Sequence, residues 1–167
     1  MIPIVCLSDD NGMAFNHRRQ SRDEKLIAYL MDRIKDQTLR MSPYSAELFE
    51  KYRPMPEENV SFFNRGSDEN SSTSNSVSKV EQNAGYDLIV EENYLKNAGP
   101  FDYCFVEKES LKPYQGQIQK IIICRWNRKY PSDIKFDLDL SAFQMTSTGE
   151  IQGKSHDKIT IEVWEKE

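Results

Sequence analysis

Apolar residues along the chain follow two spacings, and the two alternate. Short runs of consecutive apolar residues indicate strands at 2–7, 38–41, 60–63, 86–90, 102–106 and 118–126. Apolar residues three and four apart indicate helices at 22–35, from position 43, near 92–97 and, as a single turn, at 110–114. The final run, KITIEVWEKE, alternates apolar and polar residues, which is typical of an antiparallel strand with one wet face.

Two of the predicted helices have recognisable starts. Ser21 precedes Glu24 by three residues, a capping box that predicts a helix beginning at 22. Ser42 followed by Pro43 is a cap with proline at the first helical position.

This order of elements predicts the fold class. Strands alternate with helices as far as residue 126, and two strands without a helix then follow. We therefore expect a three-layer α/β domain whose mostly parallel, twisted sheet gains an antiparallel hairpin at its C-terminal end. With 167 residues, one domain spanning 1–167 is expected. Residues 64–85 are rich in Ser, Asn and acidic residues, so we predict a mobile low-complexity surface loop there.

Charge and composition narrow the classes of partner. The chain has 27 Asp and Glu against 22 Lys and Arg, so it has no overall positive charge for nucleic acid or an anionic membrane. No apolar run approaches the roughly 20 residues of a membrane span, and the start MIPIVCLSDD has no basic segment of a secretory leader. The three cysteines lie in apolar runs, which favours buried, reduced thiols. We expect a soluble cytoplasmic protein.

The densest positive charge follows the first predicted strand. The segment contains Asn16, His17, Arg18, Arg19 and Arg22. Guanidinium groups bind phosphate or carboxylate, and an imidazole exchanges protons near neutral pH, so the segment predicts an anion-binding loop. The alternative is that the arginines form surface ion pairs with acidic residues elsewhere, namely Asp9, Asp10 and Asp137 or Asp139.

Three more residues are candidates for the same site. A buried Asp23 would have a raised pKa suited to proton transfer; otherwise it is a helix N-terminal residue stabilised by the helix dipole. Trp126 and Arg128 follow the most apolar strand, and ligands of open α/β sheets bind at the carboxyl ends of strands. The neighbours 155–157, Ser-His-Asp, do not predict a catalytic triad, because successive residues of an extended chain point to opposite sides.

Several stretches together resemble one enzyme family. They are IVCLSDDNGMAFN, SRDEKLIAYL, LRMSPYS, DYCFVEKESLKPY, QKIIICRW, YPSDIKFD and KITIEVW. In this order the chain resembles dihydrofolate reductase throughout its length. The resemblance implies that fold, and it places Asp23 where the family has the carboxylate that holds and helps to protonate the pterin ring.

The cofactor motifs of that family are replaced here. Where the family has a Gly-Gly pair against the dinucleotide, this chain has Val106 and Glu107. Ser42 replaces the glycine of the Met-Gly-Arg-x-Thr motif, and Pro43 or Tyr44 its arginine. Carboxylates at the helix start expected after Val106 would repel the pyrophosphate. We predict no cofactor, and NADP, which the resemblance leaves possible, is not expected in its usual pose.

The stretch GMAFNHRRQSRD also resembles short bacterial proteins named ribonuclease Z. That enzyme family uses an HxHxDH motif for zinc, whereas this chain has two histidines and no HxH. We predict no metal site.

These observations favour a divergent dihydrofolate-reductase-like protein that binds a small anionic or heterocyclic ligand near residues 16–23. His17 and Asp23 are the candidate catalytic residues, and whether any catalysis occurs stays open. The alternatives are a non-catalytic protein-interaction module and an RNA-processing protein without the usual metal site. The expected partner is a small molecule or a protein, with no membrane and no nucleic acid.

Overall fold

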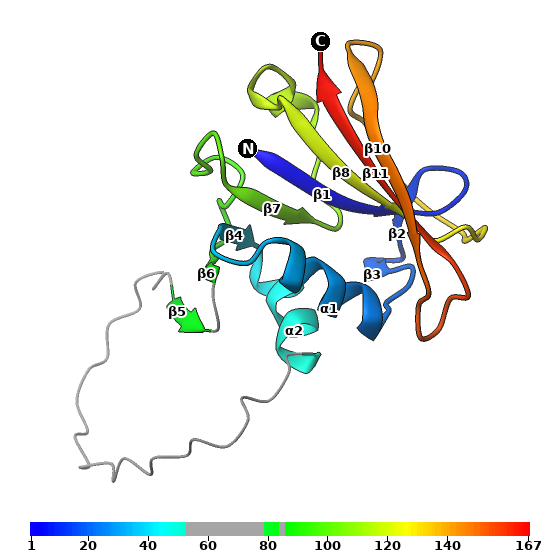
Figure 1. The fold of residues 1–167 in the computed structure, drawn as a ribbon, viewed down its shortest axis with the longest axis horizontal. Coiled ribbons are helices and arrows are strands. Elements are labelled where there is room, and N and C mark those ends of the chain that lie inside the picture. Colours follow the sequence, from blue (N-terminus) through cyan, green and yellow to red (C-terminus); the bar gives the residue numbers. More distant parts are fainter. Residues whose placement is uncertain (53–78, 84–85) are drawn as a thin grey trace, which may run out of the picture.

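The computed structural model describes residues 1–52, 79–83 and 86–167, and its main element is an eight-stranded sheet (Figure 1). The strands are β1 (Ile2–Leu7), β4 (Thr38–Met41), β5 (Lys79–Asn83), β6 (Tyr86–Val90), β7 (Tyr103–Val106), β8 (Lys120–Arg125), β10 (Phe143–Ile151) and β11 (Ile159–Lys166). Their order is β10-β11-β8-β1-β7-β4-β6-β5. The pairings from β8 through β1, β7 and β4 to β6 are all parallel, and β10 and β11 form the antiparallel C-terminal hairpin. The predicted sheet is confirmed.

A second, three-stranded sheet contains the cationic segment. Strands β2 (Gly12–Phe15), β3 (Arg18–Arg19) and β9 (Ile134–Lys135) are antiparallel in the order β3-β2-β9. Asn16 and His17 have φ values of 50° and 60° and join β2 to β3. Positive φ at both residues of a two-residue hairpin loop marks the mirror-image turn whose twist suits paired strands. Part of the predicted anion-binding loop is therefore a hairpin turn.

Both α-helices cover one face of the large sheet (Figure 1). Helix α1 (Glu24–Arg33) and helix α2 (Pro43–Lys51) bury apolar residues at helical spacing, namely Leu26, Ile27, Leu30, Ala46, Leu48 and Phe49. These side chains pack on Ile4 and Phe105, and on Ile122 and Cys124 of β8. The hydrophobic effect of this packing fixes the helices against the sheet.

The opposite face has no α-helix among the described residues. It is covered by the 3-10 helix η1 (Lys112–Gln117) and by irregular segments that contribute Tyr94, Leu111 and Leu138. The short helix predicted at 92–97 is wrong, because the chain there forms successive turns. Residues 121–124 of β8 are all fully buried, since alternate side chains enter the cores on the two faces.

One helix start differs from its prediction. The N-cap of α1 is Asp23, whose carboxylate accepts from the N–H groups of Lys25 and Leu26, and Ser21 is not the cap. An ionised carboxylate is a stronger acceptor than a hydroxyl, and the Ser21 hydroxyl has another partner, described below. Ser42 caps α2 as predicted, accepting from Ser45 N–H at 3.2 Å.

Some predictions fall outside the described residues. They are the strand at 60–63 and most of the mobile loop at 64–85; within the latter, residues 79–83 form β5. Cys6, Cys104 and Cys124 are free thiols, as predicted. Within the described ranges, neither length nor hydropathy gives any helix the character of a membrane span.

Candidate functional site

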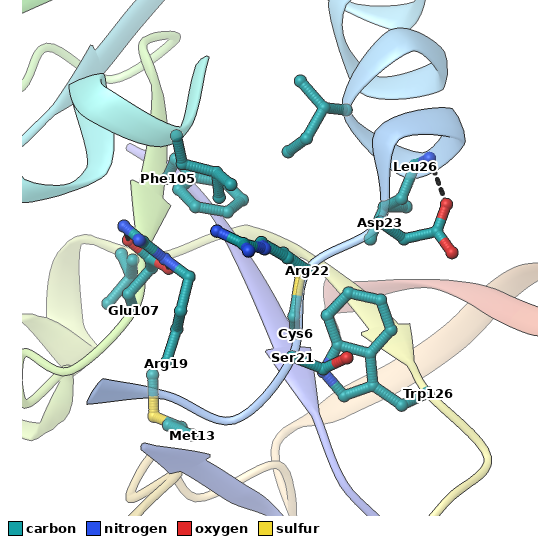
Figure 2. Close-up of a pocket in the computed structure, with 13 residues that line it drawn as sticks. Cys6, Met13, Arg19, Ser21, Arg22, Asp23, Leu26, Phe105, Glu107 and Trp126 are labelled. Carbon is teal, nitrogen blue, oxygen red and sulfur yellow. Dashed lines mark hydrogen bonds and ion pairs between the residues drawn. The ribbon is translucent and has the colours of Figure 1, made fainter. Parts of the chain in front are cut away.

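An inner cavity lies where the carboxyl ends of β1 and β7 meet the N-terminus of α1 (Figure 2). Its volume is about 20 Å³, which is room for roughly one ordered water molecule. Its polar wall includes Arg19, Ser21, Arg22 and Glu107, and Trp126 closes one side. In Figure 2 the Arg22 side chain extends across the cavity toward Phe105. The cavity is therefore too small to hold an aromatic ring of a ligand.

A larger outer groove adjoins it and shares Arg19 with it. The groove has a volume of about 510 Å³ and is lined by Phe15, Asn16, Arg18, Arg19, Gln20, Tyr130 and Pro131. Phe15 is 41% exposed, an unusual exposure for a phenyl ring. Arg18 is exposed and forms no ion pair with any residue that the structure describes. The groove thus combines aromatic surface with an available cation.

Arg19 is committed to an internal ion pair. Its Nε and Nη2 atoms lie 2.7 Å and 3.1 Å from the two carboxylate oxygens of Glu107. Ser45 donates a hydrogen bond to the same carboxylate at 2.7 Å, and the guanidinium lies 4.3 Å from the centre of the Tyr44 ring. Burial lowers the pKa of Arg19, but Glu107 outweighs burial and raises it. The alternative in which the arginines pair at the surface with Asp9, Asp10 and Asp137 or Asp139 therefore does not hold for Arg19, whose partner is Glu107.

The position of Glu107 also corrects the expected cofactor region. No α-helix begins directly after Val106; the chain bends and enters the 3-10 helix η1 at Lys112. Glu107 is neutralised by Arg19 rather than facing a phosphate. The residues here do not fit a dinucleotide pyrophosphate, because a side chain replaces each glycine of the pair and no α-helix N-terminus directly after Val106 supplies N–H donors.

Asp23 is buried, and its carboxylate is saturated by donors of its own chain. Besides the two N–H groups of α1, it accepts from Lys154 N at 2.9 Å and from Ser155 N at 2.8 Å. The Nδ1 atom of His156 lies 3.1 Å from its Oδ2 atom. These bonds tie the start of α1 to the loop between β10 and β11. They leave the carboxylate little capacity to hold a ligand.

The expected raised pKa of Asp23 is wrong. Burial alone raises the pKa of this carboxyl, but the backbone N–H groups of Lys154 and Ser155 and the ring of His156 outweigh burial and hold it below its ordinary value. Asp23 is therefore an ionised acceptor at neutral pH.

This lowered pKa predicts an acid-sensitive fold. The pKa of Asp23 in the folded state is below its unfolded value of about 3.9, so its stabilising contribution is complete above that value and is lost as the pH falls through the folded pKa. We expect the free energy of unfolding to fall below about pH 5, and to fall less steeply in Asp23→Asn. Urea unfolding at a series of pH values tests this; parallel pH profiles of the two proteins would contradict it.

His156 is the site residue that sequence reasoning missed. Its ring is stacked on Trp126, with centroids 4.5 Å apart and planes at 25°. Its Nε2 atom lies 2.9 Å from both the Ser21 hydroxyl and the Tyr130 hydroxyl. Ser155 and Asp157 do not form a triad with it, as expected; its partners come from distant segments. The sequence signalled this histidine only as part of the run 155–157, whose neighbouring residues do not form a triad with one another.

The remaining predicted residues are partly brought together. Arg22 and Trp126 line the inner cavity with Asp23, whereas Asn16 and Arg18 line the outer groove. His17 and Arg128 are exposed and line neither, so the structure does not bring His17 to Asp23. Among the described residues, no group of three or more His, Cys, Asp or Glu side chains is placed to hold a metal ion.

Comparison with known proteins identifies the fold. No protein-family model and no curated protein matches the sequence. A solved structure of dihydrofolate reductase from Enterococcus faecalis, complexed with NADP(H) and RAB-propyl, is similar with a TM-score of 0.55 and 12% sequence identity. The match covers 99% of this chain and 95% of that chain. The chain has a dihydrofolate-reductase-like α/β fold, which confirms the predicted fold class.

Proposed function

We propose that this dihydrofolate-reductase-like protein binds a small, planar, anionic ligand in its outer groove and is not a reductase. The observation that supports the proposal best is the combination of an exposed phenyl ring, Phe15, with a guanidinium, Arg18, that forms no ion pair in the described part of the chain. A volume of about 510 Å³ lies within the range of small-molecule sites.

The lining of the groove suits an aromatic heterocycle with a carboxylate or phosphate. Phe15 and Tyr130 offer apolar ring surface, and Arg18 offers a planar pair of donors to an anion. The Asn16 amide adds a donor and an acceptor for the edge of a heterocycle. Arg19 lies at the inner end, with its charge already matched by Glu107.

Two features argue against reduction by a bound dinucleotide. The Arg19–Glu107 ion pair and the bend after Val106 lie where the resemblance would place a dinucleotide pyrophosphate, and an internally paired carboxylate there does not favour such a group. The carboxylate that would hold a pterin, Asp23, accepts from four backbone N–H groups and from His156. Ligand binding without hydride transfer is the function that these contacts support.

Replacing Arg18 tests this proposal. Thermal unfolding is measured with pterin-6-carboxylate, folate, adenosine 5′-monophosphate and NADPH; a ligand at 100 times its Kd adds about 2.7 kcal/mol of stability. For the best of these ligands we expect Arg18→Ala to weaken binding at least about tenfold, which corresponds to about 1.4 kcal/mol. Isothermal titration measures the change.

Arg33→Ala is the matched control, because Arg33 is an exposed arginine of α1 that lines neither hollow. It should bind like the unmodified protein. If none of the four compounds raises the unfolding temperature, the groove is not a small-molecule site, and the alternative of a protein-interaction module gains support. Equal losses in Arg18→Ala and Arg33→Ala would show only an effect of net charge.

A further inference from the structure

Three side chains from distant parts of the chain form a hydrogen-bonded series beside the inner cavity. The Ser21 hydroxyl lies 2.9 Å from Nε2 of His156, and Nδ1 of the same ring lies 3.1 Å from Oδ2 of Asp23. Ser21 itself lines the cavity. This is the order of groups, and these are the distances, by which a base and a carboxylate activate a serine hydroxyl.

The protonation states follow from the chemistry of the three groups. Asp23 is an ionised carboxylate and only accepts, so Nδ1 of His156 must be the donor. In the neutral ring Nε2 is then unprotonated and accepts from Ser21. The His156 and Asp23 side chains are 1% and 0% exposed, so water does not compete for these bonds. Stacking on Trp126 holds the ring in its plane.

We propose that Ser21 is a nucleophile for acyl transfer, that His156 is its general base, and that Asp23 positions His156. The substrate class is a small ester or thioester that carries an anionic group. The nucleophilic role of Ser21 is independent of the proposed function, whereas the anionic group of the substrate rests on it.

Arg22, the residue after Ser21, has a backbone N–H that can donate to the negative charge that develops on the substrate carbonyl oxygen. The backbone N–H of Arg22 donates to no acceptor in the described part of the chain. In many acyl-transfer enzymes the N–H after the nucleophile stabilises the oxyanion. The Arg22 side chain is exposed and lines the same cavity, where it would bind an anionic acyl chain. A cavity of about 20 Å³ admits a carbonyl group while the rest of the substrate stays outside.

The reaction needs only water as co-reactant. Ser21 Oγ attacks the carbonyl carbon as its proton passes to Nε2 of His156, and the tetrahedral oxyanion collapses with loss of the alcohol or thiol, which takes that proton. Nε2 then removes a proton from water, the resulting hydroxide attacks the acyl-serine, and the acid leaves as Ser21 regains its proton.

Two neighbouring groups are competitors for these roles. Cys6 also lines the cavity, but its hydrogen bond with Cys124 and its burial raise the pKa of its thiol well above the ordinary value, so it is not a nucleophile. The Tyr130 hydroxyl lies 2.9 Å from the same Nε2 atom as Ser21. Tyr130→Phe would leave Ser21 as the only hydroxyl on Nε2.

The first experiment measures covalent labelling by a fluorophosphonate, which carries no anionic group. We expect one adduct per chain, located on Ser21 by peptide mass spectrometry. It should be absent in Ser21→Ala and retained in the control Ser147→Ala, because Ser147 is an exposed serine of β10. An adduct on Tyr130 or Cys6, or labelling that is unchanged in Ser21→Ala, would overturn the proposal, as would an unlabelled protein. Circular dichroism confirms that each variant is folded.

The second experiment measures hydrolysis of mono(4-nitrophenyl) glutarate against 4-nitrophenyl acetate. We expect a burst of one nitrophenolate per chain, a preference for glutarate, and a loss of at least about a hundredfold in Ser21→Ala. Arg22→Ala should lower the rate with glutarate more than the rate with acetate, which removes the preference for glutarate. If Ser21 is labelled but acetate and glutarate react alike, the nucleophile stands and the anionic substrate class fails. Glutarate hydrolysis that persists in Ser21→Ala would refute the mechanism.

Discussion

Asp23→Ala should lower the free energy of unfolding by about 3 to 5 kcal/mol, because it leaves several N–H donors without an acceptor, and a buried donor without a partner costs about 1 to 3 kcal/mol. The change removes the acceptor of four backbone N–H groups and of the His156 ring. It also removes the N-cap of α1, whose loss alone costs about 1 kcal/mol. Urea unfolding measures the change as a lower midpoint with an unchanged slope.

Asp32→Ala is the matched control for this prediction. Asp32 is an exposed residue of the same helix, and its carboxylate forms no ion pair with any residue that the structure describes. Its replacement should change the free energy of unfolding by less than about 0.5 kcal/mol. Similar losses in the two variants would mean that the buried contacts of Asp23 contribute nothing specific to stability.

Gly153→Ala should lower the free energy of unfolding by about 2 to 3 kcal/mol, although the change adds only one methyl group. A Cβ atom at position 153 would lie 2.5 Å from Oδ2 of Asp23 and 2.6 Å from the backbone oxygen of His156. Neither atom belongs to the free end of a flexible side chain, because Asp23 is held by its donors and the other atom is backbone. The loop must move, and the Asp23 contacts are lost with it.

Gly149→Ala in the neighbouring strand β10 tests whether this effect belongs to the site. A Cβ atom at Gly149 would meet nothing within 4 Å, so the free energy of unfolding of Gly149→Ala should equal that of the unmodified protein or be slightly higher. The chemical change is identical in the two variants, so the difference between them isolates the close approach of the 153–156 loop to Asp23. Equal stability of Gly153→Ala and Gly149→Ala would show that the loop is not packed on Asp23.

These contacts pair the acidic groups of the candidate site with partners within the chain. Asp23 holds the β10–β11 loop and orients His156, and Glu107 pairs with Arg19. Both acidic groups are thus satisfied within the chain, whereas Arg18 and Arg22, which line the outer groove and the inner cavity, form no ion pair with any residue that the structure describes. Any ligand chemistry of this protein is therefore expected at the arginines and Ser21.

How much of the site could be foreseen depends on the distance between partners along the chain. The cationic segment and Trp126 were identified because local charge density and the end of an apolar strand are visible in a short window. His156 was missed because its partners, Ser21 and Asp23, are more than 130 residues away. Likewise the alternative of surface ion pairs did not include Glu107 as a partner of Arg19, since nothing local distinguishes Glu107 from Asp9 or Asp137.

The sequence by itself determined most strands of the large sheet, the helices α1 and α2 and the order in which they follow, because apolar spacing is a local property that the hydrophobic effect converts into buried faces. At Asn16 and His17 the sequence showed polar residues, but it did not show that both have positive φ and form a hairpin turn. Only the tertiary structure decided which charged side chains are paired within the chain. Whether Asp23 is a free carboxylate with a raised pKa or a saturated one with a lowered pKa depends on the loop at 153–156, and that loop reaches it only when β11 pairs with β8.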